Sequence, residues 1–286
     1  MTDNLRGSLF MTLAMLGFAF EDSLLKLAAR EIALGEILAV MGLIGMGLFS
    51  AMALRNGVSP LPRSILSRTM ALRSGSEVIG RVFYALALAL TPISQASAIL
   101  QATPLVVVLG AAILFGEKVG ALRWFLIVLG FAGVLIIIRP GLDGFSALSL
   151  LAVAGLLGFA GRDLATRAAP PALTNAQLGV AGFLMLALSG VILLILNGEA
   201  ISMTPRAFAF TAGAAVFGVA AYAALTTAMR TGQVGVVTPF RYSRLLFALV
   251  IGYTVFGERP DVWTLVGSAI IVGCGIIILT QNRKRR

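Results

Sequence analysis

The sequence predicts an all-α integral membrane protein, with ten transmembrane helices arranged as two inverted five-helix repeats. Three observations lead to this prediction. Hydrophobic residues make up 59% of the 286-residue chain and charged residues only 12%, whereas a soluble protein carries about 25% charged residues. Apolar runs of about 20 residues, long enough to cross a bilayer as helices, recur along the chain. Several short motifs also occur twice at one constant spacing.

The apolar runs define the expected helices in chain order. Short connections with turn residues separate them, as at Thr91-Pro92 and Asn197-Gly198, and no stretch is suited to a soluble domain. Pro104 and Pro239 predict a local break in the fourth and ninth helices, because proline removes a backbone hydrogen bond. The expected helices cover residues 6–28, 34–54, 68–91, 93–115, 121–139, 145–168, 172–196, 207–229, 234–256 and 261–280.

Basic residues predict the orientation. With ten spans, both termini lie on one side, and the loops of that side hold twelve Lys and Arg residues against four on the other. By the positive-inside rule, both termini are therefore expected in the cytoplasm. This distribution also accounts for the net charge of +10. We therefore expect membrane lipid, and not nucleic acid, beside the basic loops.

The constant spacing between the paired motifs is 141 residues, about half the chain. It divides the chain into expected repeats 1–141 and 142–286, and Lys26 is matched by Arg167 at the same offset. Five helices per repeat is an odd number, so the second repeat enters the membrane inverted, an arrangement whose binding site lies between the repeats at mid-membrane. The paired motifs are Gly17-Phe18-Ala19 with Asp22 and Gly158-Phe159-Ala160 with Asp163, Asn56-Gly57 and Asn197-Gly198, and Phe115-Gly116-Glu117 and Phe256-Gly257-Glu258.

The two Phe-Gly-Glu turns, together with Ala96-Ser97-Ala98 leading to Thr103-Pro104-Leu105, resemble the EamA-type ten-helix transporters of the drug/metabolite transporter (DMT) superfamily. The resemblance implies a five-plus-five inverted fold and transport of small organic solutes across the bacterial inner membrane. YddG-type amino-acid exporters and carriers for riboflavin and S-adenosylmethionine belong to this superfamily. The stretch Thr238-Pro239-Phe240-Arg241-Tyr242 is similar to the ninth helix of the latter carriers, so import remains open.

Charged side chains within the spans are the candidate site residues, because a charge at mid-membrane costs roughly 3 kcal/mol unless it faces a partner or a cavity. In the third span, Arg73, Glu77, Arg81 and Tyr84 are spaced by four, four and three residues, so they share one helical stripe. Glu77 and Arg81 can alternatively form a purely structural ion pair. We expect Arg73 to lie among the cytoplasmic headgroups.

The ninth span carries Arg241, Tyr242 and Arg244. A guanidinium group binds a carboxylate or phosphate with two parallel hydrogen bonds, which makes both arginines candidates for contact with a solute. The alternative is an ion pair with Glu77 or Asp22 across the bundle. On the fourth span, Gln101 can bond a solute, or serve helix packing.

Further polar residues have expected structural roles. Asp22 with Lys26, and Asp163 with Arg167, are each four residues apart, which predicts ion pairs within a helix or between repeats. Glu21 has Arg162 as its mate, and this asymmetry makes Glu21 and Asp22 candidates for a cation or a coupling proton. Glu117 and Glu258 lie in turns, where we expect them to cap a helix or to fix the hairpin.

The sequence thus predicts a secondary transporter that exports an amino acid by alternating access. The solute carboxylate would meet Arg241 or Arg244, its ammonium group Glu77 or Asp22, and Tyr84 and Tyr242 would supply an aromatic wall. The predicted substrate-binding residues are Asp22, Glu77, Arg81, Tyr84, Gln101, Arg241, Tyr242 and Arg244.

Two alternatives remain beside this prediction. The first is an importer of a larger metabolite such as S-adenosylmethionine or riboflavin. The second is a membrane-embedded enzyme, which is disfavoured because the chain has no histidine, no metal-ligand spacing and no glycine-rich nucleotide loop. No cofactor, metal or catalytic residue is predicted, and the oligomeric state is left open.

Overall fold

The computed structural model describes residues 3–115, 120–139, 146–167, 173–198, 201–231 and 237–281. Within these ranges every regular element is a helix, which confirms the all-α class for this part of the chain. The first half contains α1 (Asp3–Ala28), α2 (Leu34–Arg55), the 3-10 helix η1 (Arg63–Leu66), α3 (Arg68–Leu90), α4 (Ile93–Leu100), α5 (Thr103–Phe115) and α6 (Ala121–Ile138). The second half contains α7 (Ser149–Arg167), α8 (Asn175–Asn197), α9 (Pro205–Thr231), the 3-10 helix η2 (Thr238–Tyr242), α11 (Ser243–Phe256) and α12 (Val262–Gln281).

Several of these helices have the composition of membrane spans. Five segments are long and apolar enough to cross a bilayer, namely α1, α2, the stretch 93–114 through α4 and α5, α8 and α9. Shorter apolar helices lie at Trp124–Ile138 and Val262–Ile277. Large apolar side chains such as Ile195 and Leu196 are about three-quarters exposed (74% and 75%), as expected for surfaces that face lipid. The number of crossings and the side of the termini remain predictions.

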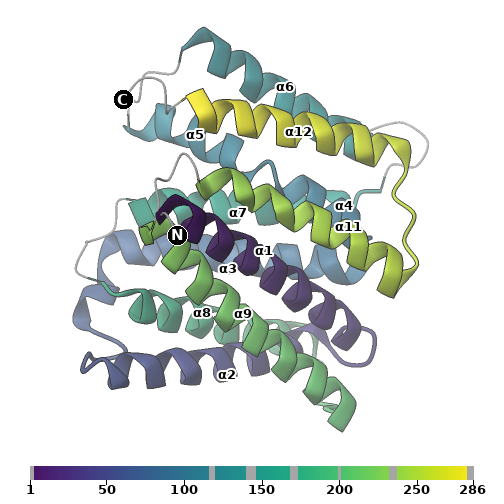
Figure 1. Cartoon of the computed structure of the whole chain (residues 1–286). Coiled ribbons are helices and arrows are strands. Elements are labelled where there is room, and N and C mark those ends of the chain that lie inside the picture. The colour runs from purple at the N-terminus through teal and green to yellow at the C-terminus, as the bar shows by residue number, and fades with distance from the viewer. Residues whose placement is uncertain are drawn as a thin grey trace.

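The helices pack in pairs that join the two halves of the chain. The most extensive contacts are between α1 and α9, α2 and α8, α3 and α7, and α6 and α12. In Figure 1, the α6–α12 pair lies at one end of the bundle and the α2–α8 pair at the other. Because each pair takes one helix from each half, the halves are interlocked and share one core.

Small residues allow two of these pairs to approach closely. A methyl group added at Gly158 of α7 would overlap with the backbone nitrogen of Gly80 in α3. One added at Gly17 of α1 would lie 3.0 Å from the Cβ of Ala221 in α9. Such close contacts are the usual basis of helix association in membranes, where hydrocarbon provides no hydrophobic drive between helices.

Two of the expected helices are broken near their middle. The range 93–115 divides into α4 and α5 around Gln101 and Ala102, just before Pro104 in the first turn of α5. In the range 237–256, the 3-10 helix η2 precedes α11. The predicted breaks are therefore confirmed at both places. The breaks also contact each other, since Gln101 Nε2 donates to the backbone oxygen of Arg241 at 3.2 Å.

Candidate functional site

Charged side chains from α1, α3, α7, η2 and α11 converge inside the bundle. We refer to them as the charge cluster. It contains five arginines and four carboxylates, which leaves one net positive charge when all are ionised. An isolated charge at this depth is costly, so their mutual pairing is what makes burial tolerable. Its members are Glu21, Asp22, Arg73, Glu77, Arg81, Arg162, Asp163, Arg241 and Arg244.

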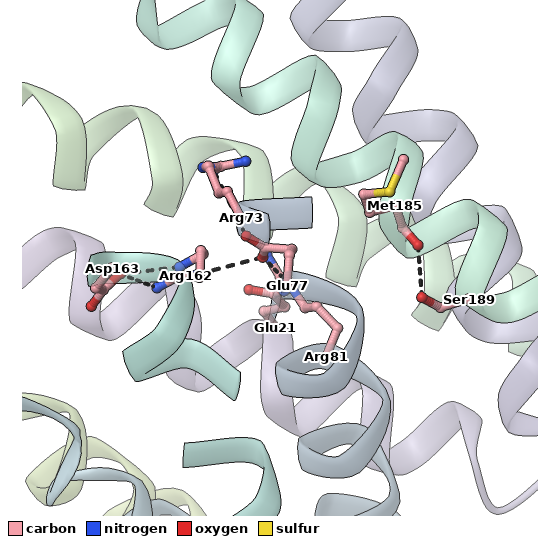
Figure 2. A network of polar contacts seen from close by, with 8 residues as sticks. All are labelled: Glu21, Arg73, Glu77, Arg81, Arg162, Asp163, Met185 and Ser189. Atoms are coloured by element: carbon pink, nitrogen blue, oxygen red, sulfur yellow. Dashed lines mark hydrogen bonds and ion pairs between the residues drawn. The ribbon is translucent and has the colours of Figure 1, made fainter. Parts of the chain in front are cut away.

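Glu77 lies at the centre of the charge cluster (Figure 2). Its carboxylate oxygens lie 3.2 Å from Arg81 Nε, 3.4 Å from Arg162 Nη1 and 3.7 Å from Arg73 Nη2. The stripe predicted on α3 is confirmed, and so is the Glu77–Arg81 pair one turn apart. The prediction for Arg73 was wrong, because this side chain is only 2% exposed. Its place one helical turn before Glu77 directs it into the bundle, not towards the headgroups.

The pairing extends from Glu77 in both directions. Arg81 Nη1 reaches Glu21 Oε1 on α1 at 3.0 Å. On the other side, Arg162 donates to Asp163 Oδ1 through Nε at 3.0 Å and Nη2 at 2.9 Å. Asp163 Oδ2 then lies 3.9 Å from Arg241 Nη2. A continuous series of ion pairs therefore connects α1, α3, α7 and η2.

Arg244 forms a separate and tighter pair beside this series. Its Nη2 and Nε donate to Asp22 Oδ2 at 2.6 and 3.3 Å. The Tyr84 hydroxyl donates to the same oxygen at 3.2 Å and lies 3.4 Å from Ser97 Oγ. The guanidinium group also lies over the rings of Phe18 and Tyr84, 5.1 and 5.5 Å from their centroids, a favourable cation–π geometry. The alternative of an Arg244–Asp22 pair across the bundle is thus confirmed.

The pairing predicted between Asp22 and Lys26 within α1 was wrong, although each residue pairs between the two halves of the chain. Lys26 Nζ donates to the backbone oxygens of Leu88, at 3.0 Å, and of Thr91. It also lies 3.7 Å from Glu258 Oε1. The carbonyls at the end of α3 have no partner within the helix, so they attract the lysine. The side chain of Arg167 lies outside the described residues.

Glu258 caps a helix, but not one of its own hairpin. Its carboxylate accepts hydrogen bonds from the backbone nitrogens of Ile93 and Ser94 at 2.8 and 3.1 Å, and from Ser94 Oγ at 2.8 Å. It thereby caps the N-terminus of α4, where a negative charge is favoured. The capping role is confirmed, and Glu258 additionally links α4 to Lys26. Glu117 lies outside the described residues.

Seven of the eight predicted site residues lie in or beside the charge cluster, and Tyr242 does not. Its hydroxyl group points to α12, into space that exists because residue 275 is glycine. This oxygen is buried without a hydrogen-bond partner among the described residues. Sequence reasoning did not place Arg162 and Asp163 in the site. The signal for them was their position within an apolar span, which by itself predicts a functional or paired charge.

Comparisons with known proteins agree with a transport site. The chain is 26% identical to the riboflavin transporter of Rhizobium johnstonii over 98% of its length and 92% of the relative. It is 26% identical to the pseudopaline exporter CntI of Pseudomonas aeruginosa over 97% of each chain. It is 24% identical to the S-adenosylmethionine uptake transporter of Rickettsia bellii over 72% of this chain and 70% of the relative. A crystal structure with 21% identity superposes with a TM-score of 0.67 over 98% of both chains, which supports the fold alone.

The family model for EamA-like transporters matches residues 5–139 and again residues 144–281. These matches cover nearly the whole chain and agree with the relatives, all of which are named as transporters and none as an enzyme. The chain therefore belongs to the EamA-like transporter family, within the drug/metabolite transporter superfamily.

Proposed function

We propose that this protein is a secondary transporter of the bacterial inner membrane that exports an amino acid or a similar zwitterion by alternating access. The observation that carries the proposal is the charge cluster, buried between the two halves of the chain with one positive charge in excess. A solute carboxylate would balance this excess. Unlike a permanent structural network, such a site gains an additional counter-charge only when it is loaded.

The packing supports two inverted repeats, 1–141 and 142–286. At the offset of 141 residues, α1 corresponds to α7 and α3 to α9, so the α1–α9 pair corresponds to the α7–α3 pair. The same correspondence holds for single contacts: Gly17 against Ala221 becomes Gly158 against Gly80. This exchange is what a two-fold axis between inverted repeats produces. It favours ten spans, with cytoplasmic termini from the distribution of basic residues.

In the proposed mechanism, the solute exchanges with ion pairs that are already present. Its carboxylate meets Arg241 or Arg244, its ammonium group meets Glu77 or Asp22, and Tyr84 contributes an aromatic wall. Gln101 lies beside Arg241 at the helix breaks, where unwound backbone is available to a solute. Different pairings in two states would allow the site to open alternately to each side.

One face of the bundle is closed by the contact of Lys26 and Glu258. It joins the end of α1 to the ends of α3 and α11 and to the start of α4. In the predicted topology this is the periplasmic face. Export requires this contact to separate, and it does so without breaking the charge cluster, which is formed by other residues.

The names of the relatives leave a second candidate, import of a larger metabolite. One relative is named as an uptake transporter for S-adenosylmethionine and another as an exporter of pseudopaline, so direction varies within the family. Riboflavin or S-adenosylmethionine would use the same charges. Export of an amino acid remains our proposal, because paired opposite charges suit a small zwitterion.

Counterflow in proteoliposomes tests the proposal. Purified protein is reconstituted with unlabelled amino acids, riboflavin or S-adenosylmethionine inside, and uptake of the labelled compound is measured. We expect saturable exchange of an amino acid, lost in Arg241→Ala and Arg244→Ala. Arg206→Ala is the matched control, because Arg206 is 76% exposed and pairs with Glu31 at the surface. Exchange of riboflavin or S-adenosylmethionine without any amino acid would overturn the substrate class. Exchange that survives both cluster variants would overturn the site.

A further inference from the structure

We infer that Asp163 binds the ammonium group of the solute, opposite Arg241, and that Asp22 is a permanent structural partner of Arg244. This inference rests on the proposed function and narrows it. It selects one carboxylate that the sequence had assigned to a structural ion pair. It also selects one of the two candidate arginines for the solute carboxylate.

The two aspartates occupy equivalent positions in the repeats, 141 residues apart, but their surroundings differ. Asp22 Oδ2 accepts from Arg244 at 2.6 Å and from the Tyr84 hydroxyl at 3.2 Å. Its side chain is only 6% exposed. Rings of Phe18 and Tyr84 flank the arginine. A solute group would have to displace several well-placed contacts to bind there.

Asp163 has one anchored oxygen and one open oxygen. Arg162 holds Oδ1 with two hydrogen bonds at 2.9 and 3.0 Å, which fixes the orientation of the carboxylate. Oδ2 faces Arg241 Nη2 at 3.9 Å, which is longer than a hydrogen bond. No described residue donates a hydrogen bond to Oδ2. An ionised carboxylate offers about two acceptor positions per oxygen, so Oδ2 can accept from an ammonium group.

Exposure identifies the same pair. The side chains of Arg241 and Asp163 are 29% and 25% exposed, against 15% and 6% for Arg244 and Asp22. Charged groups inside a membrane protein face a water-filled route and not hydrocarbon. Arg241 and Asp163 are therefore the members of the charge cluster that a dissolved solute reaches first. Glu77, by contrast, is 3% exposed and is shared by three arginines.

The geometry suits a zwitterion in particular. Arg241 and Asp163 form an ion pair without a hydrogen bond, so separating them costs little. An amino acid then supplies a carboxylate to Arg241 and an ammonium group to Asp163, and each charge gains a hydrogen-bonded partner. A carboxylic acid that lacks the ammonium group would satisfy Arg241 and leave Asp163 without its counter-charge. Asp163 thus makes the site selective for amino acids over their deaminated analogues.

Counterflow with paired probes tests this inference. Each amino acid that the wild-type protein exchanges is compared with the carboxylic acid of the same side chain that carries hydrogen in place of the ammonium group. We expect Asp163→Asn to weaken the apparent affinity for the amino acid roughly 10- to 100-fold, the effect of losing one charge-assisted hydrogen bond. Affinity for the deaminated acid should stay equal or improve, so discrimination is lost. Asp22→Asn, its repeat mate, should lower thermal stability but preserve the discrimination of the protein that remains folded.

The outcomes separate this inference from the proposed function. Discrimination retained in Asp163→Asn, in a variant that still exchanges amino acids, would overturn the role of Asp163 alone. Absence of any amino-acid exchange by the wild-type protein would overturn the substrate class and this inference with it. If Asp163→Asn does not fold, Asp163→Glu keeps the charge but displaces the carboxylate by one carbon–carbon bond. A several-fold loss is then expected for the amino acid only, and wild-type affinities for both probes would contradict the inference.

Discussion

Replacing Glu77 by glutamine removes the central negative charge of the charge cluster while keeping the shape of the side chain. Three guanidinium groups lie within 3.2 to 3.7 Å of this carboxylate, whose side chain is 3% exposed. Removing one partner of a buried ion pair costs about 3–5 kcal/mol, because the remaining charge is left without compensation. At about 2–4 °C per kcal/mol, the midpoint of thermal unfolding should fall by on the order of 10 °C.

Thermal unfolding in detergent, followed by intrinsic fluorescence, measures this effect, with size-exclusion chromatography to verify a folded starting state. Glu31→Gln is the matched control, because Glu31 pairs with an arginine that is 76% exposed and such pairs contribute at most about 1 kcal/mol. The double variant Glu77→Gln/Arg162→Gln removes one charge of each sign and should recover part of the loss. A midpoint for Glu77→Gln within about 2 °C of wild type, like that of the control, would refute the account of the charge cluster.

Three further predictions concern helix contacts. Gly158→Ala should lower thermal stability by about 1–3 kcal/mol, because its methyl group meets the α3 backbone, whereas Gly273→Ala has open space and should be neutral or slightly stabilising; equal midpoints would contradict the close contact. Asp261→Ala should cost about 1 kcal/mol, since Asp261 Oδ1 accepts from the Thr264 nitrogen at 2.8 Å. Burial acts to raise the pKa of Asp261, but hydrogen bonds from Thr264 and the charge of Arg139 outweigh it and hold the pKa below its usual 3.8. The stabilisation is therefore present above about pH 4 and lost as pH falls through the lowered pKa, and a wild-type advantage that persists at pH 2 would argue against it. Glu258→Gln should speed hydrogen exchange at the α4 N-terminus, where Glu258 accepts two backbone hydrogen bonds, and unchanged exchange would exclude the cap.

The sequence predicted features that depend on spacing along one helix. The stripe from Arg73 to Tyr84 follows from helical periodicity, and its burial follows from the cost of charge in hydrocarbon. The breaks near Pro104 and Pro239 follow from the missing backbone donor of proline. The extents of the helices followed from apolar runs and turn residues. Each of these signals is local, so no knowledge of neighbours was needed.

Partners across the bundle were harder to predict. Asp22 and Arg244 are 222 residues apart, and whether Asp22 pairs with Arg244 or with the nearer Lys26 depends on how α1 packs. Lys26 instead reaches backbone carbonyls at the end of α3, an attraction that no side-chain pattern displays. Tyr242 was assigned to the site from its neighbours, but the 3-10 geometry of η2 turns it towards Gly275. Such differences arise from helix rotation and packing, which periodicity alone does not determine.

The most direct test of the central claim replaces and then restores the positive charge at position 241. Cys274 is the single cysteine of the chain, so Arg241→Cys in a Cys274→Ala background has one reactive thiol. Exchange of the amino acid that the parent protein transports is measured before and after treatment with a cationic aminoethyl or an anionic sulfonatoethyl methanethiosulfonate. The account predicts that Arg241→Cys loses exchange and that only the cationic reagent restores it. Undiminished exchange in the untreated variant, or equal effects of the two reagents, would contradict it.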